Sequence, residues 1–226
     1  LMMIAILIPT AYLLLWEGKT KGYWINMLLV QSGVTGTLFS LDIVLFYFFW
    51  EVMLLPVFLM IGSYGFGDKV FTTIKVTVYT MAGSLLMFVA ILYLGVAHFN
   101  QFGEWSFAYD SLMQISTIPY DTKVWLFLAF LAAFAIKIPI FPLHTWIMET
   151  YKNAPTGAVF LLSSIMAKLG VYAIVRFMIP IFPDIYVEFS TWFVAVGLFG
   201  LIYFGIAALM QDDIKRMFAY SSASHL

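Results

Sequence analysis

The sequence has no cysteine and few charged residues. Of its 226 residues 10% are charged, whereas an average soluble protein has roughly 25%. Without cysteine, the chain has no disulfide and no thiolate ligand for a zinc ion or an iron–sulfur cluster. Eleven Lys and Arg residues stand against twelve Asp and Glu residues, so no basic surface for nucleic acid is expected. These shortages exclude a soluble globular domain, a disordered tail and a nucleic-acid-binding protein.

Apolar residues, in contrast, make up 63% of the sequence and form long runs that follow one another closely. A helix needs about 20 mainly apolar residues to cross the roughly 30 Å hydrocarbon layer. The runs are apolar on every face, which favours helices over the alternating strands of a barrel. The sequence therefore predicts an all-α polytopic membrane protein with seven transmembrane helices and the start of an eighth. The predicted spans are 2–16, 23–41, 43–61, 74–97, 124–148, 155–181, 189–210 and 213 onward.

The ends and connections of these spans indicate one membrane domain. One apolar run begins at Leu1 and another continues to Leu226, so we expect residues 1–226 to be an internal fragment of a longer chain. The longest connection, 98–123, is rich in aromatic residues and is expected to form a packed element outside the membrane.

Seven Lys and Arg residues follow odd-numbered spans, and two lie on the opposite side. The positive-inside rule therefore predicts that odd-numbered spans exit to the cytoplasm of a multi-pass protein in the cell inner (plasma) membrane.

Three charged residues lie in the middle of predicted spans: Glu51, Lys137 and Lys168. A charge at the bilayer centre costs at least about 2.5–3.5 kcal/mol, so these side chains must face protein or water. A lysine can extend its amine to the membrane surface only near a helix end, whereas these positions are central. An ion pair with a purely structural role would leave the second lysine unexplained. Burial lowers the pKa of a lysine and a neighbouring carboxylate raises it, which suits a residue that binds and releases protons. We therefore interpret the three residues as a proton relay bridged by water.

Two prolines directly after the central lysine predict a broken helix near residues 137–142. Pro139 and Pro142 each remove a donor from the helical hydrogen-bond ladder. We expect the carbonyl groups of Ala135 and Ile138 to be freed as a result. Broken helices at membrane depth line cavities or pack within protein, and they often mark transport sites.

Two histidines are further candidates for the relay. His144 lies seven residues past Lys137 on a similar helical face, and His225 follows a serine-rich segment in the last predicted span. Each could carry protons, or could simply form a hydrogen bond to a backbone carbonyl. The three histidines of the chain are scattered without a spacing that suits haem or a metal ion. We therefore expect no cofactor and no metal in this chain.

Six motifs follow one another along the chain: Phe49–Pro56, Lys137–Trp146, Ala154–Thr156, Lys168–Tyr172, Arg176–Phe177 and Asp213–Ser222. Taken together, they resemble the antiporter-like M subunits of respiratory complex I (NADH-quinone oxidoreductase). They agree with that family in order and spacing from about residue 23 to the end of the sequence. The resemblance implies a fourteen-helix protein with two inverted five-helix repeats, the first over 23–181 and the second beginning at 189–226.

The resemblance also implies an activity and partners. The chain would translocate protons, while electron transfer occurs in other subunits that hold FMN and iron–sulfur clusters and act on NADH and quinone. Glu51 would modulate Lys137, and Lys168 would pass the proton to a second half-channel. The implied partners are the antiporter-like L and N subunits of the complex and the lipid bilayer.

One departure from the family pattern affects the segment after Trp146. The family usually reads Leu-Pro-Asp-Ala-His there, whereas this chain has residues 147–151 as Ile-Met-Glu-Thr-Tyr. The family histidine is thus absent, and Glu149 is the candidate to replace the aspartate. Alternative interpretations are a subunit of an Mrp-type cation/proton antiporter or of a membrane-bound hydrogenase, and a non-transporting scaffold. The coupling ion, proton or sodium, is open at this point.

Overall fold

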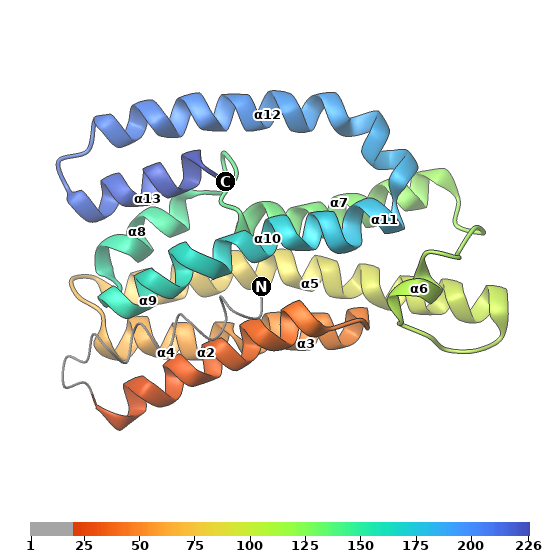
Figure 1. Ribbon diagram of the computed structural model, residues 1–226, viewed down its shortest axis with the longest axis horizontal. Helices are drawn as coiled ribbons and strands as arrows, with labels where there is room; N and C mark the ends of the chain where they lie inside the picture. The colour runs from red at the N-terminus through yellow and green to blue at the C-terminus, as the bar shows by residue number, and fades with distance from the viewer. Residues whose placement is uncertain (1–19) are drawn as a thin grey trace.

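A computed structural model shows residues 20–226 as a bundle of helices that run side by side along one direction (Figure 1). These residues contain no β-strand, only an isolated bridge between Asp42 and Ala108. The all-α prediction is therefore confirmed for this part of the chain. The predicted span at 2–16 lies outside the described residues.

The first three helices correspond to two of the predicted spans. Helix α2 covers Lys21–Phe39, α3 covers Ile43–Val52 and α4 covers Leu54–Tyr64. The carboxylate of Asp42 caps α3 by accepting hydrogen bonds from two backbone N–H groups of its first turn, at 2.9 and 3.0 Å. The span predicted over 43–61 is thus two helices, which are interrupted between Val52 and Leu54.

The connection predicted over 98–123 is shorter in the structure, because the neighbouring helices extend into it. Helix α5 covers Lys69–Phe102 and ends at Gly103, whose φ of 79° suits a residue without Cβ. A short helix α6 covers Tyr109–Leu112, and α7 covers Tyr120–Lys137. The loop was predicted too long because the aromatic residues that follow the apolar run still belong to α5.

The remaining helices form the rest of the bundle. The predicted span 155–181 is a single long helical stretch in which two turns are π-helical, labelled η1 and η2. The predicted spans 189–210 and 213 onward correspond to α12 and α13. The bounds are α8 Thr145–Asn153, α9 Thr156–Leu161, η1 Leu162–Met166, α10 Ala167–Ala173, η2 Ile174–Met178, α11 Ile179–Ile181, α12 Pro183–Leu209 and α13 Ile214–Ser224.

Four helical stretches among the described residues are long and apolar enough to cross a membrane. The chain is therefore a membrane protein, as its composition predicts. Helices α2 and α7, with 19 and 18 residues, are the other long helices of the described part. The four stretches are Ile43–Tyr64, Lys69–Phe102, Thr156–Ile181 and Pro183–Leu209.

Close packing of α5 against α7 supports the centre of the bundle. A Cβ atom added at Gly83 of α5 would lie 3.0 Å from the Cα atom of Ala133 and 2.8 Å from the side chain of Ile136. The missing side chain therefore lets the two backbones approach closely, as small residues do between membrane helices. Helix α12 has fewer buried residues than the other three stretches, since only 11% of its most apolar segment is buried within the described structure.

Basic residues gather at one end of the bundle. The end of α4, the α8–α9 connection and the α12–α13 connection meet there (Figure 1). The N–H of Phe66 donates to the Asn153 carbonyl at 2.6 Å, and the Lys215 amine donates to the Ala154 carbonyl at 3.3 Å. The lysines and arginine at this end are Lys21, Lys69, Lys152, Lys215 and Arg216.

Candidate functional site

The predicted break after the central lysine is present. Helix α7 ends at Lys137, residues 138–144 form turns, and α8 begins at Thr145. The prediction for the Ala135 carbonyl is wrong, because this carbonyl accepts a hydrogen bond from the N–H of Ile140 at 2.9 Å. The chain turns so tightly after the helix that a later N–H replaces the donor that proline lacks.

The indole of Trp146 joins the two sides of this break through a hydrogen bond. The Nε1–H of Trp146, the second residue of α8, donates to the carbonyl of Ile136 at 2.9 Å. Both groups are buried, so the carbonyl has no water as an alternative partner. Trp146 therefore ties α8 to the last turn of α7. The sequence shows the tryptophan but does not predict which carbonyl it would reach.

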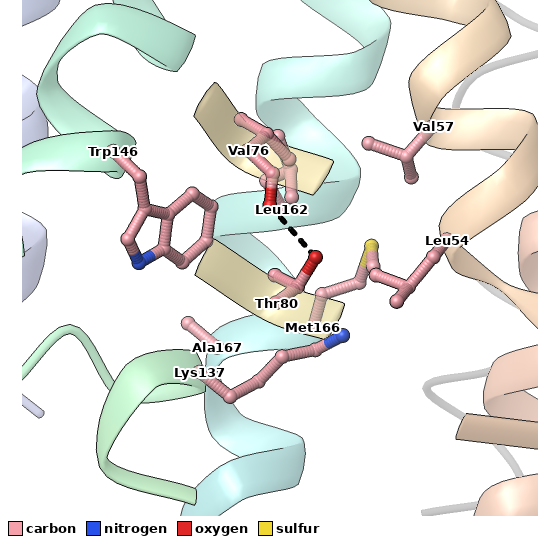
Figure 2. A pocket seen from close by; sticks show the side chains of 9 residues that line it. All are labelled: Leu54, Val57, Val76, Thr80, Lys137, Trp146, Leu162, Met166 and Ala167. Carbon is pink, nitrogen blue, oxygen red and sulfur yellow. Dashed lines mark hydrogen bonds between the residues drawn. The ribbon is translucent and has the colours of Figure 1, made fainter. Parts of the chain in front are cut away.

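Lys137 is buried at this break without a hydrogen-bond partner for its amine. The side chain is 4% exposed, and the Nζ atom has no hydrogen bond in the described structure. The amine lies 4.8 Å from the ring centroid of Trp50, within the range of a cation–π contact. In Figure 2 it reaches past Met166 toward α4, in a cavity of about 10 Å³, which is at the lower limit for one water molecule (about 10–15 Å³). The cavity is lined by Leu54, Val57, Val76, Thr80, Lys137, Trp146, Leu162, Met166 and Ala167.

Glu51 shares this interior site. It lies in the last turn of α3, and its Oε1 atom is buried without a hydrogen-bond partner. The carboxylate interacts electrostatically with Lys137 and lies near the Ser84 hydroxyl of α5. The amine of Lys137 and the carboxylate of Glu51 do not form a direct ion pair. The structure thus brings two of the three predicted relay residues into one region, separated by more than a hydrogen bond.

Lys168 does not join this pair in the described structure. Its side chain is exposed on α10, and its amine donates to the carbonyl of Ser163, one turn earlier. The two π-helical segments η1 and η2 flank α10 on both sides. Short π-helical segments are rare and occur frequently at functional sites. The sequence placed Lys168 correctly at the middle of a long helix but did not predict the π-helical turns beside it.

The two candidate histidines differ in their surroundings. His144, 6% exposed, is enclosed by aromatic rings of Phe141, Phe204 and Tyr220, and its Nδ1 atom has no hydrogen-bond partner in the described residues. His225 is exposed at the end of α13 and lines a separate cavity. His144 lies at the start of α8, in the segment that begins at Lys137, whereas His225 lies on another helix.

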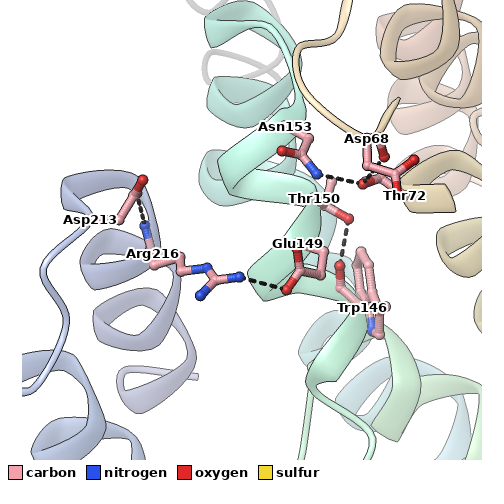
Figure 3. Close-up of polar contacts among 8 residues, drawn as sticks. All are labelled: Asp68, Thr72, Trp146, Glu149, Thr150, Asn153, Asp213 and Arg216. Carbon is pink, nitrogen blue, oxygen red and sulfur yellow. Dashed lines mark hydrogen bonds and ion pairs between the residues drawn. The ribbon is translucent and has the colours of Figure 1, made fainter. Parts of the chain in front are cut away.

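A charged contact links α8 to α13. Arg216 donates to the Glu149 carboxylate at 2.8 Å, and the two side chains are 34% and 28% exposed (Figure 3). Asp213 caps α13 by accepting from the N–H of Arg216 at 2.9 Å. On the opposite side of α8, the Asn153 amide donates to the Thr72 hydroxyl at 2.7 Å. Glu149, predicted as a replacement for an aspartate, therefore has a defined partner on the next helix.

Within residues 20–226, no group of three or more His, Asp or Glu side chains could hold a metal ion. The titratable groups at the site are the buried amine of Lys137 and the carboxylate of Glu51, which interact electrostatically without a direct contact. Such groups can bind and release protons, and their charges depend on each other.

Comparison with known proteins relates this arrangement to a family. The family described as NADH:quinone oxidoreductase/Mrp antiporter, TM, matches residues 40–226. NADH-quinone oxidoreductase subunit M of Escherichia coli (strain K12) is 35% identical over 214 residues, which are 92% of this chain and 42% of the relative. NAD(P)H-quinone oxidoreductase chain 4, chloroplastic, of Physcomitrium patens is 35% identical over 90% of this chain and 40% of the relative.

Solved structures share the same fold. Respiratory complex I from Thermus thermophilus with bound NADH matches with a TM-score of 0.81 and 29% identity, over 90% of this chain and 42% of that chain. The membrane-bound sulfane sulfur reductase, an archaeal respiratory membrane complex, matches with a TM-score of 0.79 and 25% identity, over 92% and 34%. The chain spans less than half the length of each of these relatives. With a matched segment that begins at residue 40 and includes both halves of the broken helix, the chain belongs to the NADH:quinone oxidoreductase/Mrp antiporter transmembrane family.

Proposed function

We propose that this chain is part of a proton-translocating membrane subunit of NADH:quinone oxidoreductase, the respiratory complex I. The redox steps, with NADH, FMN, iron–sulfur clusters and quinone, take place in other subunits of that complex. Its neighbours in the membrane are antiporter-like subunits of the L and N types. The similarity to relatives named subunit M supports this assignment over most of the chain.

The buried amine of Lys137 is the observation that carries the proposal. A lysine that is 4% exposed and lacks a hydrogen-bond partner is expensive to keep charged within a membrane. The nearby carboxylate of Glu51 offsets part of this penalty when it is ionised. A change in the distance between the two groups therefore changes the proton affinity of the amine, as a pump requires.

Lys168 extends this pathway in the proposal. Protons leave Lys137 along water toward Lys168 and from there toward a second half-channel. His144 and His225 are further candidate residues of the relay. The break at Pro139 and Pro142 provides the irregular backbone that such a passage needs at membrane depth. The small gap beside Lys137, at the limit of one water, makes hydration the step that opens or closes the path.

The topology of the subunit follows the same reasoning. We propose seven spans and the start of an eighth, with 23–181 as the first repeat and 189–226 as the start of a second, inverted one. The basic end of the bundle then faces the cytoplasm of a bacterial inner membrane. Five of the basic residues counted for the positive-inside rule lie at this end, which supports the orientation.

Substitution of Lys137 tests the proposal. In the assembled complex, Lys137→Met should slow proton transfer through this subunit by about 100-fold or more, because a proton-carrying group is lost. Proton pumping and NADH oxidation are measured together in membrane vesicles, and Lys152→Met, an exposed lysine of α8, is the matched control. Full pumping in Lys137→Met would instead support a scaffold without transport.

The alternative is a subunit of an Mrp-type cation/proton antiporter or a membrane-bound hydrogenase. The family description names Mrp antiporters, and the fold also matches the membrane-bound sulfane sulfur reductase. The neighbouring genes distinguish these possibilities. Genes for NADH-binding and quinone-site subunits favour complex I, whereas antiporter or hydrogenase genes favour the alternative. Sodium dependence of transport in vesicles then identifies the coupling ion.

A further inference from the structure

Among the described residues, the amine of Lys137 contacts the ring of Trp50 but no hydrogen-bond acceptor. The nitrogen atom lies 4.8 Å from the ring centroid and has no hydrogen bond. A cation within about 6 Å of a ring centroid is attracted by the negative face of the ring, and indole attracts it more strongly than the other aromatic side chains do. The ring therefore stabilises a charged amine even where the carboxylate of Glu51 does not touch it.

The backbone at the end of α7 does not bind this amine. The last turn of a helix has carbonyl groups without intrahelical donors, and a nearby amine is one group that could donate to them. Three of these carbonyl groups already accept a hydrogen bond from another donor. The pairs are Phe134 with the Ile138 N–H at 2.8 Å, Ala135 with the Ile140 N–H at 2.9 Å, and Ile136 with the Trp146 indole at 2.9 Å.

Packing fixes the ring beside the amine. Trp50 is 2% exposed, and its ring lies against the rings of Phe46 and Phe134, with centroids 5.4 and 5.7 Å away. Phe134 lies one turn before Lys137, so the same helix supports both the ring and the amine. Side chains in such a close-packed interior occupy single rotamers. The distance between the ring and the amine is therefore set by the packing of α3 on α7.

We propose that Trp50 is a positioning residue, whose ring face holds the charged amine of Lys137 while the carboxylate of Glu51 is out of contact. The inference rests on the proposed function, in which Lys137 carries the proton. A charged amine in an apolar interior is expensive unless another group compensates it. Because the ring compensates part of this cost, it limits how far the proton affinity of the amine changes when Glu51 moves.

Fluorinated tryptophans at position 50 test the role of the ring face. Fluorine withdraws electron density from the ring, so one, two and three fluorine atoms weaken its attraction for a cation in steps while the indole shape is nearly kept. The analogues are incorporated by nonsense suppression, and proton translocation by the assembled complex is measured in vesicles. Transfer through this subunit should fall about threefold with each fluorine. The total of about thirtyfold corresponds to the loss of a desolvated cation–π contact of about 2 kcal/mol.

Two controls separate the ring face from packing. The same analogues at Trp192, which is 69% exposed, should leave translocation unchanged. A methyl group on the indole of Trp50 is larger than fluorine but does not withdraw electron density, so it should leave translocation within about twofold of that with tryptophan. A loss with the methyl group as large as that with three fluorine atoms would attribute the effect to packing and overturn the inference. Equal translocation with all three fluorinated rings would also overturn it.

The substitution Lys137→Met distinguishes failure of this inference from failure of the proposed function. Loss of translocation in Lys137→Met, together with no effect of fluorine at Trp50, would reject the role of the ring and leave the proton-carrying lysine in place. Full translocation in Lys137→Met would reject the proposed function and, with it, the positioning role of Trp50. Loss in Lys137→Met together with a graded loss on fluorination is the result that we expect.

Discussion

The unusual residue of this protein is a lysine whose buried amine faces an aromatic ring, lies near a carboxylate without contacting it directly, and has space for about one water molecule beside it. Trp50 provides the aromatic face, at 4.8 Å from the amine of Lys137. A desolvated cation–π contact contributes about 2 kcal/mol, which offsets only part of the cost of burying a charge. The amine is thus sensitive to any movement of Glu51 or of one water molecule. This sensitivity is what a proton-switching group needs.

Sequence reasoning could predict the depth of Glu51 and Lys137 but not their immediate contacts. Depth follows from counting residues along an apolar span, and two opposite charges at equal depth have an obvious reason to meet. The contact between Lys137 and Trp50 could not be predicted, since nothing in the sequence shows which ring face a lysine will reach. The burial of His98, 4% exposed with its Nδ1 atom 2.9 Å from the Glu104 carbonyl oxygen, also depends on chain folding beyond the span.

Trp146→Phe should destabilise the protein by about 1–3 kcal/mol, because the buried carbonyl of Ile136 loses its donor. Unfolding of the purified full-length subunit in detergent, followed by circular dichroism, measures the change. Trp192→Phe is the matched control, since Trp192 is 69% exposed and should tolerate the change within about 0.5 kcal/mol. Equal stability of the two variants would show that the indole does not hold the break together.

At the scale of elements, the break between α7 and α8 could be predicted from Pro139 and Pro142. Proline removes a donor wherever it stands in a helix, so this conclusion does not depend on the tertiary fold. The π-helical segments η1 and η2 could not be predicted in this way. A π-helical turn inserts an extra residue and rotates the helix face that follows it, so residue counting does not show which way Lys168 points.

Gly83→Ala should separate α5 from α7 and destabilise the protein by about 1–3 kcal/mol through overpacking. The added Cβ atom would lie 3.0 Å from a backbone atom of Ala133, which cannot move aside as a side-chain end can. Gly197→Ala is the control, because nothing lies within 4 Å of its added Cβ. That change should be neutral or stabilise the helix by up to about 1 kcal/mol. The same unfolding assay compares them, and similar values would argue against close packing at Gly83.

The contact between Glu149 and Arg216 should contribute modestly to the packing of α8 on α13. A double-mutant cycle with Glu149→Gln and Arg216→Gln should give a coupling free energy of about 0.5–1 kcal/mol, since both side chains are about a third exposed. Raised ionic strength should reduce this coupling, because partly exposed charges are screened. A coupling free energy of zero at low salt would mean that apolar packing alone joins the two helices.

At the scale of the whole molecule, the three residues that we interpreted from the sequence as one proton relay lie in two different environments. Lys137 is buried beside a cavity of about 10 Å³, with the half-buried Glu51 nearby, whereas Lys168 lies on an exposed face. Composition predicted the membrane class and the count of basic residues predicted an orientation, because both are sums over the chain. The separation depends on how helices from distant parts of the sequence enclose each residue, which such sums do not contain.

The ratio of protons translocated per NADH oxidised, measured for Glu51→Gln in the assembled complex in proteoliposomes, tests the central claim most directly. The amide keeps the size of the side chain and removes the charge that acts on Lys137, so the ratio should fall below that of the unsubstituted complex. Glu104→Gln, an exposed carboxylate in the connection after α5, should leave the ratio unchanged. A ratio in Glu51→Gln equal to that of the control would contradict the electrostatic switch between Glu51 and Lys137.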